Sequence, residues 1–317
     1  MSEKIIIDTD PGIDDAMAIF LAFQAPELEV IGLTTIFGNV SVNMATDNAI
    51  SLCDMADQHI PVAKGIAMPW VGPESSYAHF VHGDNGMGNV PIPAPSRDAD
   101  PRSAAQFIID SAKQYPGEVT LVAVGPLGNL AMALRLEPEL PKLLKRVVIM
   151  GGAARTRGNV SPVAEANIWN DPYGAEIAFN AGWNLTMIGL DVTYSVSYDQ
   201  AFLSKLAELN PKLGAYIKDI AQYYVKFYSE QYQDVAVPVC YFHDAMAIAQ
   251  VIDPSLFEYQ TGHIRVATDA LNYGQTSFAN KDDKMIHEEW KKEPLVQVAM
   301  SVDGERLAKL FLDNYGR

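Results

Sequence analysis

The sequence predicts an α/β fold in which helices cover both faces of a mostly parallel central sheet. Two observations support this prediction. Short apolar runs typical of buried strands alternate with segments rich in helix formers. The strand-like runs recur roughly every thirty residues, which is the spacing of βαβ units. In such a sheet ligands bind beyond the carboxyl ends of the strands, so functional residues are expected in the loops that follow the strands.

The amino-terminal segment opens this alternation. A buried strand is expected at 4–7, where β-branched residues predominate, and the turn Asp8-Thr9-Asp10-Pro11-Gly12 ends it. From Ile13 the chain is rich in helix formers, and Asp14 and Asp15 fall in the first turn of the expected helix. The next strand and helix are expected at 28–35 and 42–55.

The region from Met68 to Arg102 differs, because it is rich in proline and glycine and has no sustained periodicity. It is expected to be a long surface loop, and loops of that length are usually functional. Beyond it, helices are expected at 104–113, 127–136, 172–180 and 304–314, strands at 119–124, 147–150, 185–190 and 295–301, and mainly helix at 202–250. No repeat or linker divides the sequence, so one domain spanning 1–317 is expected.

Composition and charge exclude several functions. The chain has 317 residues, with 39 Asp and Glu against 23 Lys and Arg, and a formal charge of −16. This balance argues against a nucleic-acid or anionic-membrane partner and favours a neutral or cationic ligand. Cys53 and Cys240 lack the spacing of a zinc site or a disulfide framework. With no signal-like or membrane-spanning stretch, a cytoplasmic protein is expected.

Four aspartates occur close together at the end of the first strand: Asp8, Asp10, Asp14 and Asp15. Carboxylates held close together either raise each other's pKa or bind a cation, and a flexible turn of oxygen ligands suits Ca²⁺ better than Mg²⁺. The alternative is that they cap the following helix. Capping accounts for one or two aspartates but not readily for four, so the metal interpretation is favoured.

Further polar groups follow later strands, namely Val124-Gly125-Pro126, Asn159, Glu165, Asn167 and His243-Asp244. Backbone carbonyls beside Gly-Pro can ligate a hard cation, and Glu and Asn side chains pair well with sugar hydroxyls. Each signal is weak by itself. Taken alone, His243 is more readily explained as a core histidine beside a capping Asp244.

The long loop and one helical segment add aromatic and histidine candidates. His79 and His82 lie in the loop, where exposed polar residues are the ordinary expectation. Tyr224, Tyr228 and Tyr232 recur at i+4 and form one aromatic helix face. Core packing is the ordinary explanation, and a stacking surface for a planar ring is the alternative. No glycine-rich phosphate loop follows a strand, so a nucleotide cofactor is not expected.

The segment Asp8-Thr9-Asp10-Pro11-Gly12-Ile13-Asp14-Asp15-Ala16 resembles the amino-terminal signature of the nucleoside hydrolases, especially the inosine/uridine-preferring group. The resemblance spans nearly the whole chain. Matching motifs follow in the order of that family, namely Gly38-Asn39, Val81-His82-Gly83, Val124-Gly125-Pro126-Leu127, Met150-Gly151-Gly152, Gly158-Asn159, Glu165 with Asn167, and His243-Asp244.

The resemblance implies a Rossmann-like sheet, a homodimer or homotetramer, and Ca²⁺-dependent hydrolysis of ribonucleosides of the inosine, uridine and cytidine class in nucleoside salvage. The N-glycosidic bond would break through an oxocarbenium-like transition state, giving ribose and free base. The residues that it assigns to Ca²⁺ are Asp10, Asp15, Asp244 and the carbonyl of Val124. The residues that it assigns to the ribose are Asp14, Asn39, Asn159, Glu165, Asn167 and Asp244.

The resemblance also implies catalytic roles. Asp10 would take the proton of the attacking water, and His243 would serve as the general acid for the base. His82, Tyr228 and Tyr232 would lie near the base. The sequence departs from the family at Val124, where relatives carry Thr, at Ala166, where they carry Phe, and over 269–280.

Two other functions stay open at this point. The pair Asp8 and Asp10 also fits the DxD motif of haloacid-dehalogenase-type phosphatases, although Gly12 does not fit that motif. The second alternative is a Ca²⁺-dependent nucleoside-binding protein without turnover, which the change at Ala166 and the divergent 269–280 segment would allow. The presence of Asp10 and His243 argues against it.

Overall fold

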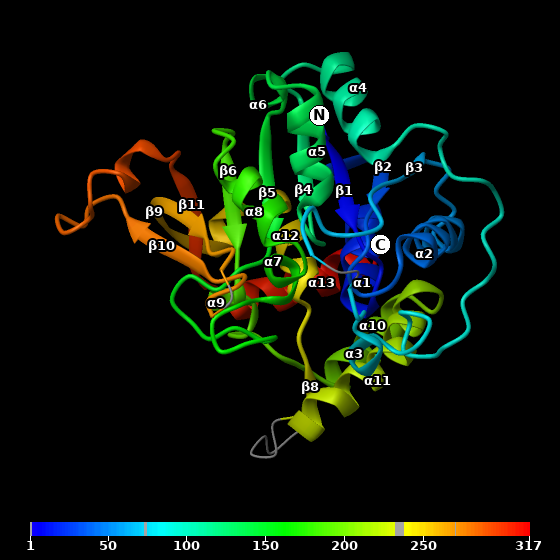
Figure 1. Cartoon of the computed structure of the whole chain (residues 1–317). Coiled ribbons are helices and arrows are strands. Elements are labelled where there is room, and N and C mark those ends of the chain that lie inside the picture. The colour runs from blue at the N-terminus through cyan, green and yellow to red at the C-terminus, as the bar shows by residue number, and fades with distance from the viewer. Residues whose placement is uncertain (1, 73–74, 232–237, 270) are drawn as a thin grey trace.

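The computed structural model describes residues 2–72, 75–231, 238–269 and 271–317. Helices and strands alternate along the chain much as the sequence predicts (Figure 1). The strands are β1 (Glu3–Thr9), β2 (Leu28–Thr35), β3 (Val62–Lys64), β4 (Val119–Ala123), β5 (Arg146–Met150), β6 (Leu185–Ile188), β7 (Tyr198–Asp199), β8 (Val239–Cys240), β9 (Phe257–Val266), β10 (Thr276–Asn280) and β11 (Val296–Val302). The α-helices are α1 (Ile13–Gln24), α2 (Val42–Met55), α3 (His79–His82), α4 (Ala104–Gln114), α5 (Gly128–Leu136), α6 (Leu140–Leu143), α7 (Ala166–Asn170), α8 (Pro172–Phe179), α9 (Leu190–Thr193), α10 (Gln200–Leu209), α11 (Leu213–Gln231), α12 (His243–Ile252) and α13 (Gly304–Tyr315). Two short 3-10 helices, η1 (Pro254–Leu256) and η2 (Trp290–Lys292), complete the described elements.

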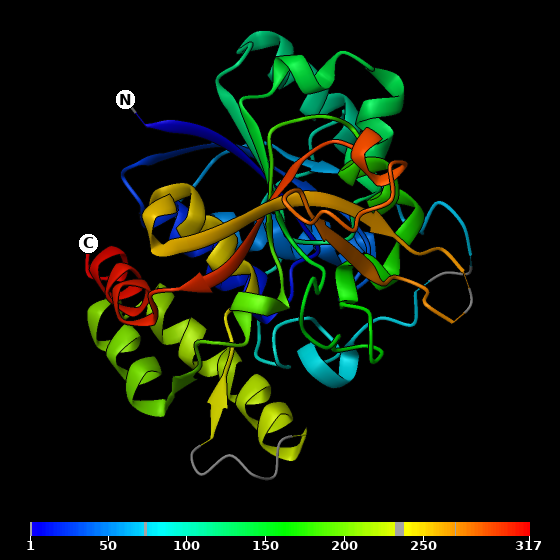
Figure 2. The ribbon, with the colours of Figure 1, turned by 90° about the vertical axis from the view of Figure 1, so that its left-hand side faces the viewer.

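A nine-stranded sheet forms the centre, in the order β10-β9-β11-β6-β5-β4-β1-β2-β3. The strands from β11 to β3 pair in parallel, so the expected mostly parallel sheet is confirmed. β9 runs antiparallel to both β11 and β10. Figure 2, which looks onto this edge, shows these three strands in front of the parallel ones. The parallel part carries the βα junctions at which a ligand site is expected.

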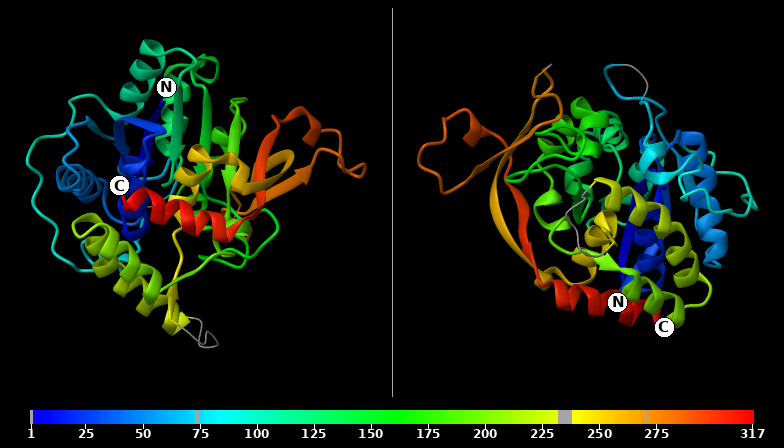
Figure 3. Two further views of the ribbon diagram at one scale, coloured as in Figure 1. Left: turned by 180° about the vertical axis from the view of Figure 1, so that it is seen from behind. Right: turned by 90° about the horizontal axis from the view of Figure 1, so that it is seen from below.

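Side chains of the strands contribute to two apolar cores, one on each face of the sheet. Along β1, Ile5 and Ile7 belong to a core shared with α1, α2 and α10 to α13, whereas Ile6 belongs to a core shared with α4, α5 and α8. Successive side chains of a strand point to opposite faces, so a strand covered on both faces is apolar at nearly every position. Seen from behind in Figure 3, α13 crosses the first of these faces.

Three regions carry elements that the sequence did not predict: the loop at 68–102, the segment 202–250, which is otherwise mainly helix as predicted, and 257–280, which holds the antiparallel pair β9 and β10. The loop at 68–102 contains one helical turn, α3, which places His82 in the interior. The segment 202–250 is interrupted by β8, which pairs with β7 in a separate two-stranded sheet. Residues 232–237, and with them Tyr232, lie outside the described residues.

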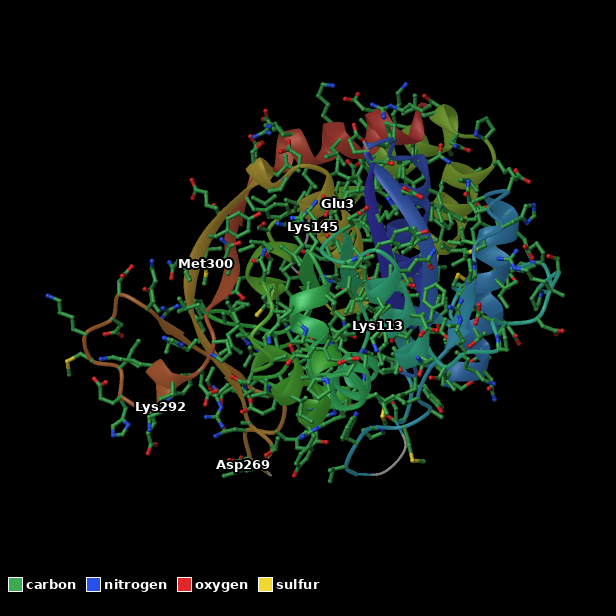
Figure 4. All side chains as sticks on the ribbon, turned by 90° about the horizontal axis from the view of Figure 1, so that it is seen from above. Glu3, Lys113, Lys145, Asp269, Lys292 and Met300 are labelled. Carbon is green, nitrogen blue, oxygen red and sulfur yellow. The ribbon has the colours of Figure 1, made fainter. Side chains whose placement is uncertain are left out.

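The amino ends of β1 and β5 lie close together at the end of the sheet opposite the pocket, which is described below. Figure 4 labels Glu3 and Lys145 there, and their side chains form an ion pair of 2.6 Å. Partial burial would raise the pKa of the Glu3 carboxyl, but hydrogen bonds from Lys145 and Thr120, together with Arg146 at 3.0 Å, lower it. Within the described ranges, every helix is too short or too polar to cross a membrane.

Candidate active site

One pocket gathers side chains from both halves of the chain. It lies beyond the carboxyl ends of β4 and β5, since Val124 directly follows β4 and Met150 ends β5. The predicted site residues that line it are Asp14, Asn39, His82, Val124, Asn159, Glu165, Asn167, Tyr228, His243 and Asp244. Asp10 and Asp15 are buried beside it and are hydrogen-bonded to Asn39.

The turn between β1 and α1 is organised around the carboxylate of Asp15. This carboxylate accepts hydrogen bonds from the backbone N–H of Gly12 at 2.9 Å, from that of Asp10 at 3.2 Å and from the hydroxyl of Thr9. Because Gly12 is the N-cap of α1, the capping interpretation is correct for Asp15. The side-chain amide of Asn39 donates a further bond at 3.0 Å, so this carboxylate is held rigidly.

Asp10 fits between two glycines. Its Oδ2 accepts the backbone N–H of Asn39 at 2.6 Å. A Cβ at Gly38 would lie 2.0 Å from Oδ2, and a Cβ at Gly125 would lie 2.7 Å from Oδ1. Oδ1 has no hydrogen-bond partner among the described residues. A buried carboxylate oxygen left in this state is costly, which marks this atom as a position for a cation or a proton.

Three buried carboxylates, those of Asp14, Asp15 and Asp244, offer oxygens that lie within 4.8 Å of one another. Burial and the neighbouring Asp15 raise the pKa of Asp14 to about 8, and burial and repulsion from Asp14 raise the pKa of Asp244 well above its usual value. A hard divalent cation would relieve this repulsion, and the oxygen ligands suit one. Asp10 is not part of the three-residue cluster. We call Asp10, Asp14, Asp15 and Asp244 the acidic floor.

Asn167 and Glu165 form the next side of the pocket. The Nδ2 of Asn167 donates to the carbonyls of Val124 at 2.9 Å and Met150 at 3.1 Å, which joins the ends of β4 and β5. Its Oδ1 thereby remains available to a ligand. Glu165 caps α7 by accepting the backbone N–H of Asn167 at 2.9 Å, and it also accepts that of Gly152 at 2.9 Å. Both side chains are therefore held in place before any ligand arrives.

The loop between β5 and α7 completes this side. Asn159 is exposed, and its Oδ1 accepts the backbone N–H of Ala166 at 2.9 Å. Ala166 itself lines the pocket. A ligand would therefore meet a small side chain at this position.

His82 is 5% exposed, so the ordinary expectation of an exposed loop residue is wrong for it, although His79 is exposed. Its Nδ1 accepts the backbone N–H of Ile13, the first residue of α1, at 3.1 Å. A Cβ at Gly12 would lie 2.6 Å from this nitrogen, so glycine permits the approach. Burial lowers the pKa of His82 to about 3, which keeps the ring neutral with its proton on Nε2.

His243 is also buried, and burial lowers its pKa to about 3. Its Nε2 lies 2.8 Å from the hydroxyl of Tyr228, and its Nδ1 lies 2.7 Å from the hydroxyl of Thr193. Tyr228 and Tyr224 belong to the apolar core, which confirms core packing for these two residues, and they also line the pocket, so a stacking surface for a planar ring stays a prediction. We call His82, Tyr224, Tyr228 and His243 the aromatic wall.

The sequence did not identify several residues of the pocket. Phe80 and Phe227 line it with ring centroids 5.9 Å apart, and Tyr194 lies edge-on to His243. Thr193, which contacts His243, was missed as well. The sequence did offer one signal for Thr193, since it is among the polar residues that follow the expected strand at 185–190.

Asp8 lies outside the pocket, although it is only two residues from Asp10. It is fully buried, and its Oδ1 accepts hydrogen bonds from the hydroxyl of Thr34 at 2.5 Å and from the amide of Asn129 at 2.8 Å. A DxD phosphatase would need this residue as its nucleophile. Its position therefore argues against the phosphatase alternative.

Comparison with known proteins agrees with this geometry. Residues 5–309 match the family described as inosine-uridine preferring nucleoside hydrolase. The chain is 43% identical to uridine nucleosidase 1 of Arabidopsis thaliana over 86% of this chain and 81% of that protein. It is 41% identical to the inosine-uridine preferring nucleoside hydrolase of Leishmania major over 87% of each chain.

Solved structures agree in fold over the whole length. A plant nucleoside hydrolase superposes with a TM-score of 0.95 at 39% identity, covering 100% of this chain and 99% of that one. A purine-preferring ribonucleoside hydrolase from Gardnerella vaginalis gives a TM-score of 0.91 at 34% identity, covering 99% and 98%. The chain therefore belongs to the inosine-uridine preferring nucleoside hydrolase family and is an N-glycosyl hydrolase.

Proposed function

We propose that this chain hydrolyses ribonucleosides of the inosine, uridine and cytidine class to ribose and free base, in a Ca²⁺-dependent reaction of nucleoside salvage. The observation that carries the proposal is the meeting of the acidic floor and the aromatic wall in one pocket. The floor suits a sugar that develops positive charge, and the wall suits a departing planar base.

The sugar hydroxyls would be held by side chains that are already fixed. Asn167 offers Oδ1 because its Nδ2 is bound to two carbonyls, and Asn39 offers Oδ1 because its Nδ2 is bound to Asp15. We propose that Asp14, Asn159, Glu165 and Asp244 complete this set. In the transition state C1′ of the ribose becomes cationic, so the nearby carboxylates stabilise it more than they stabilise the ground state.

We propose that Asp10, Asp15, Asp244 and the carbonyl of Val124 hold Ca²⁺, with Asp14 beside them. The unpartnered Oδ1 of Asp10 and the repulsion within the cluster both support a cation there. When bound, a divalent cation would lower the pKa of a neighbouring water, so that Asp10 could remove its proton more easily.

The positions of Asp10 and His243 indicate where two protons would go during the reaction. As the water attacks C1′, its proton would go to Oδ1 of Asp10, and the C1′–N bond would break with its electron pair going to the base. His243, with Tyr228, would offer its proton to the departing base. The resting imidazole is neutral, so it would first take up a second proton from solvent, and it would return to the neutral form when it protonates the base. Asp10 would then release the proton of the attacking water to solvent, so that the protons balance over one turnover.

The remaining parts of the proposal concern assembly and context. We propose a single domain over 1–317, a homodimer or homotetramer, and a cytoplasmic location, with no nucleic-acid or membrane partner. The uninterrupted nine-stranded sheet and the net charge of −16 support the first and last of these.

The test is release of free ribose from inosine, uridine, cytidine and adenosine by protein stripped with a chelator, before and after Ca²⁺ is restored. We expect ribose only in the presence of the cation, with the relative rates giving the base preference. Binding of a nucleoside without ribose release would favour the alternative of a binding protein, and phosphate release from esters would favour the phosphatase.

A further inference from the structure

The residues that carry His82 lie far in sequence from the acidic turn that they face. We call residues 78–90, which contain α3, the His82 loop. Nδ1 of His82 accepts the backbone N–H of Ile13 at 3.1 Å, which joins the ring to the first residue of α1. On another side of the loop, α3 lies beside α11 (Figure 1). The position of the ring in the pocket therefore depends on how this loop docks against the turn.

Asn48 of α2 joins the His82 loop to that turn. Its Nδ2 donates to the carbonyl of Pro11 at 3.2 Å and to the carbonyl of Asn85 at 2.9 Å. The carbonyl of Pro11 lies in the turn between β1 and α1, and the carbonyl of Asn85 lies in the His82 loop. Asn48 is 5% exposed, and the two bonds use both protons of its amide. This buried amide thus fixes the distance between the turn and the loop.

The His82 loop is cross-linked within itself, so a constraint at Asn85 reaches His82. Oδ1 of Asn85 accepts the backbone N–H of Asn89 at 3.0 Å, and its Nδ2 donates to the carbonyl of Val90 at 2.8 Å. The carbonyl of His82 accepts the backbone N–H of Gly88 at 2.8 Å. Because these bonds join the two ends of the loop, a displacement at Asn85 would move His82 as well.

Gly86 allows the loop to come this close to the turn. Its φ is +76°, a conformation that favours glycine. A Cβ at this position would lie 2.8 Å from the carbonyl oxygen of Pro11 and 3.0 Å from Nδ2 of Asn48. The backbone of the His82 loop therefore packs directly on the bridge that Asn48 makes, and this packing is independent of the two hydrogen bonds.

We infer that Asn48 is a positioning residue, which docks the His82 loop on the turn between β1 and α1 and so sets the place of His82 in the aromatic wall. This inference rests on the proposed function, in which the wall contacts the base. Asn48 is absent from the described residues that line the pocket, so its effect reaches the substrate through the loop. Without the amide, the carbonyls of Pro11 and Asn85 lose their donor and the loop shifts.

The first test compares Asn48→Leu, which keeps the size of the side chain but removes the donor, with Asn314→Leu as the control. Asn314 is also buried, and its Nδ2 donates to a carbonyl within α13, a helix that contributes no residue to the pocket lining. Each variant is assayed with inosine and with p-nitrophenyl β-ribofuranoside, whose leaving group needs no proton.

We expect Asn48→Leu to lower kcat/KM for inosine by about 10- to 100-fold and for the nitrophenyl riboside by less than about fivefold, because His82 belongs to the wall and not to the ribose site. Asn314→Leu should leave both values within about threefold. An equal loss on both substrates in Asn48→Leu would mean that Asn48 supports the acidic floor, and would overturn the inference.

A second variant, Gly86→Ala, tests the same contact from the side of the loop, since its Cβ would meet the bridge. Gly117→Ala is the matched control, because Gly117 has a φ of +74° but a Cβ there meets nothing within 4 Å. The backbone strain is alike in the two variants, so a difference between them reports the contact. We expect Gly86→Ala to show the same contrast between substrates as Asn48→Leu, and Gly117→Ala to be active. Full activity of Gly86→Ala on inosine would contradict the inference.

A third readout does not depend on turnover. In hydrogen exchange followed by mass spectrometry, peptides covering 78–90 should exchange about tenfold faster in Asn48→Leu than in the unaltered chain, and should not change in Asn314→Leu. Unchanged exchange in Asn48→Leu would overturn the inference. If the unaltered chain cleaves neither nucleosides nor the riboside, the proposed function fails, and the exchange rates still decide whether Asn48 docks the loop.

Discussion

The acidic floor and the aromatic wall meet in one pocket but are built differently. The floor lies in the turn between β1 and α1 and in the first turns of α1 and α12, and backbone N–H groups hold Asp10 and Asp15 in place. The wall comes from α3, α11 and α12, and side-chain contacts hold much of it, such as Tyr228 with His243 at 2.8 Å. α12 carries both, since His243 belongs to the wall and Asp244 to the floor. The backbone next to the sheet thus fixes the position of the floor. The position of the wall depends instead on how helices that are distant in sequence pack together.

We infer from this difference that the floor and the wall contact different parts of the substrate. A floor fixed by the backbone suits the ribose and the cation, which are the same for every nucleoside. A wall built from packed side chains can vary with the base. Changes in the floor should therefore affect all substrates alike, and changes in the wall should depend on the leaving group.

The largest effect is expected for Asp10→Asn. It removes the unpartnered oxygen proposed to accept a proton and to contact the cation, so kcat should fall by about 10³-fold or more for every nucleoside. Steady-state ribose release measures this loss. Asp8→Asn is the matched control, because the amide keeps the oxygen that Thr34 and Asn129 contact, and its activity should stay within about threefold. Near-normal activity of Asp10→Asn would contradict the proposed mechanism.

Gly38→Ala tests whether the floor depends on close packing. The new Cβ would lie 2.0 Å from Oδ2 of Asp10, so the carboxylate must move. We expect kcat to fall by about 10- to 100-fold while the protein stays folded, as checked by circular dichroism. Gly316→Ala, where the added Cβ meets nothing closer than 3.2 Å, serves as the control. Full activity of Gly38→Ala would contradict a requirement for the exact position of Asp10.

The floor should also make stability depend on pH when no cation is bound. The pKa of Asp14 is raised from 3.8 to about 8, so the folded state binds its proton more tightly than the unfolded state does. That contribution is complete below about pH 4 and is lost as the pH rises through about 8. The Tm of chelated protein should therefore fall between pH 6 and pH 8, and Ca²⁺ should raise it more at pH 8. A Tm gain from Ca²⁺ that is the same at both pH values would argue against the floor as the cation site.

The smallest effect is expected for Ala166→Phe, in the lining of the pocket. A ring there adds apolar surface beside the ligand, so KM should change by less than about tenfold and kcat should change little. Titration of initial rates with inosine and uridine measures both constants. A large fall in kcat would mean that the small side chain at this position is needed for catalysis itself.

The two regions also differ in how far the sequence predicts them. Three residues of the floor, Asp10, Asp14 and Asp15, were predictable because they stand in one short segment after an apolar strand, where the βα junction fixes their location. Asp8 in the same segment lies outside the pocket, and Asp244 was assigned to the site only through the family resemblance. The parallel strands were predictable for the same reason, since burial on both faces makes them uninterrupted apolar runs.

The wall was only partly predictable. His82 reaches the pocket through a single helical turn inside an irregular loop, and Phe80 lies in the same turn. Thr193 contacts His243 across 50 residues of sequence. Such contacts arise from packing between distant elements, and a local pattern does not record them. The spacing of the tyrosines was visible in the sequence, but it did not show which of these side chains would contact a ligand.

The most direct test of the division between floor and wall sets Asp14→Asn against His243→Asn, each with inosine and with p-nitrophenyl β-ribofuranoside. We predict that Asp14→Asn lowers kcat/KM for both substrates by the same factor, within about threefold, because both share the ribose. His243→Asn should lower kcat/KM for inosine by about 10²-fold or more and for the nitrophenyl riboside by less than about fivefold. Equal losses on the two substrates in the His243 variant would contradict the account.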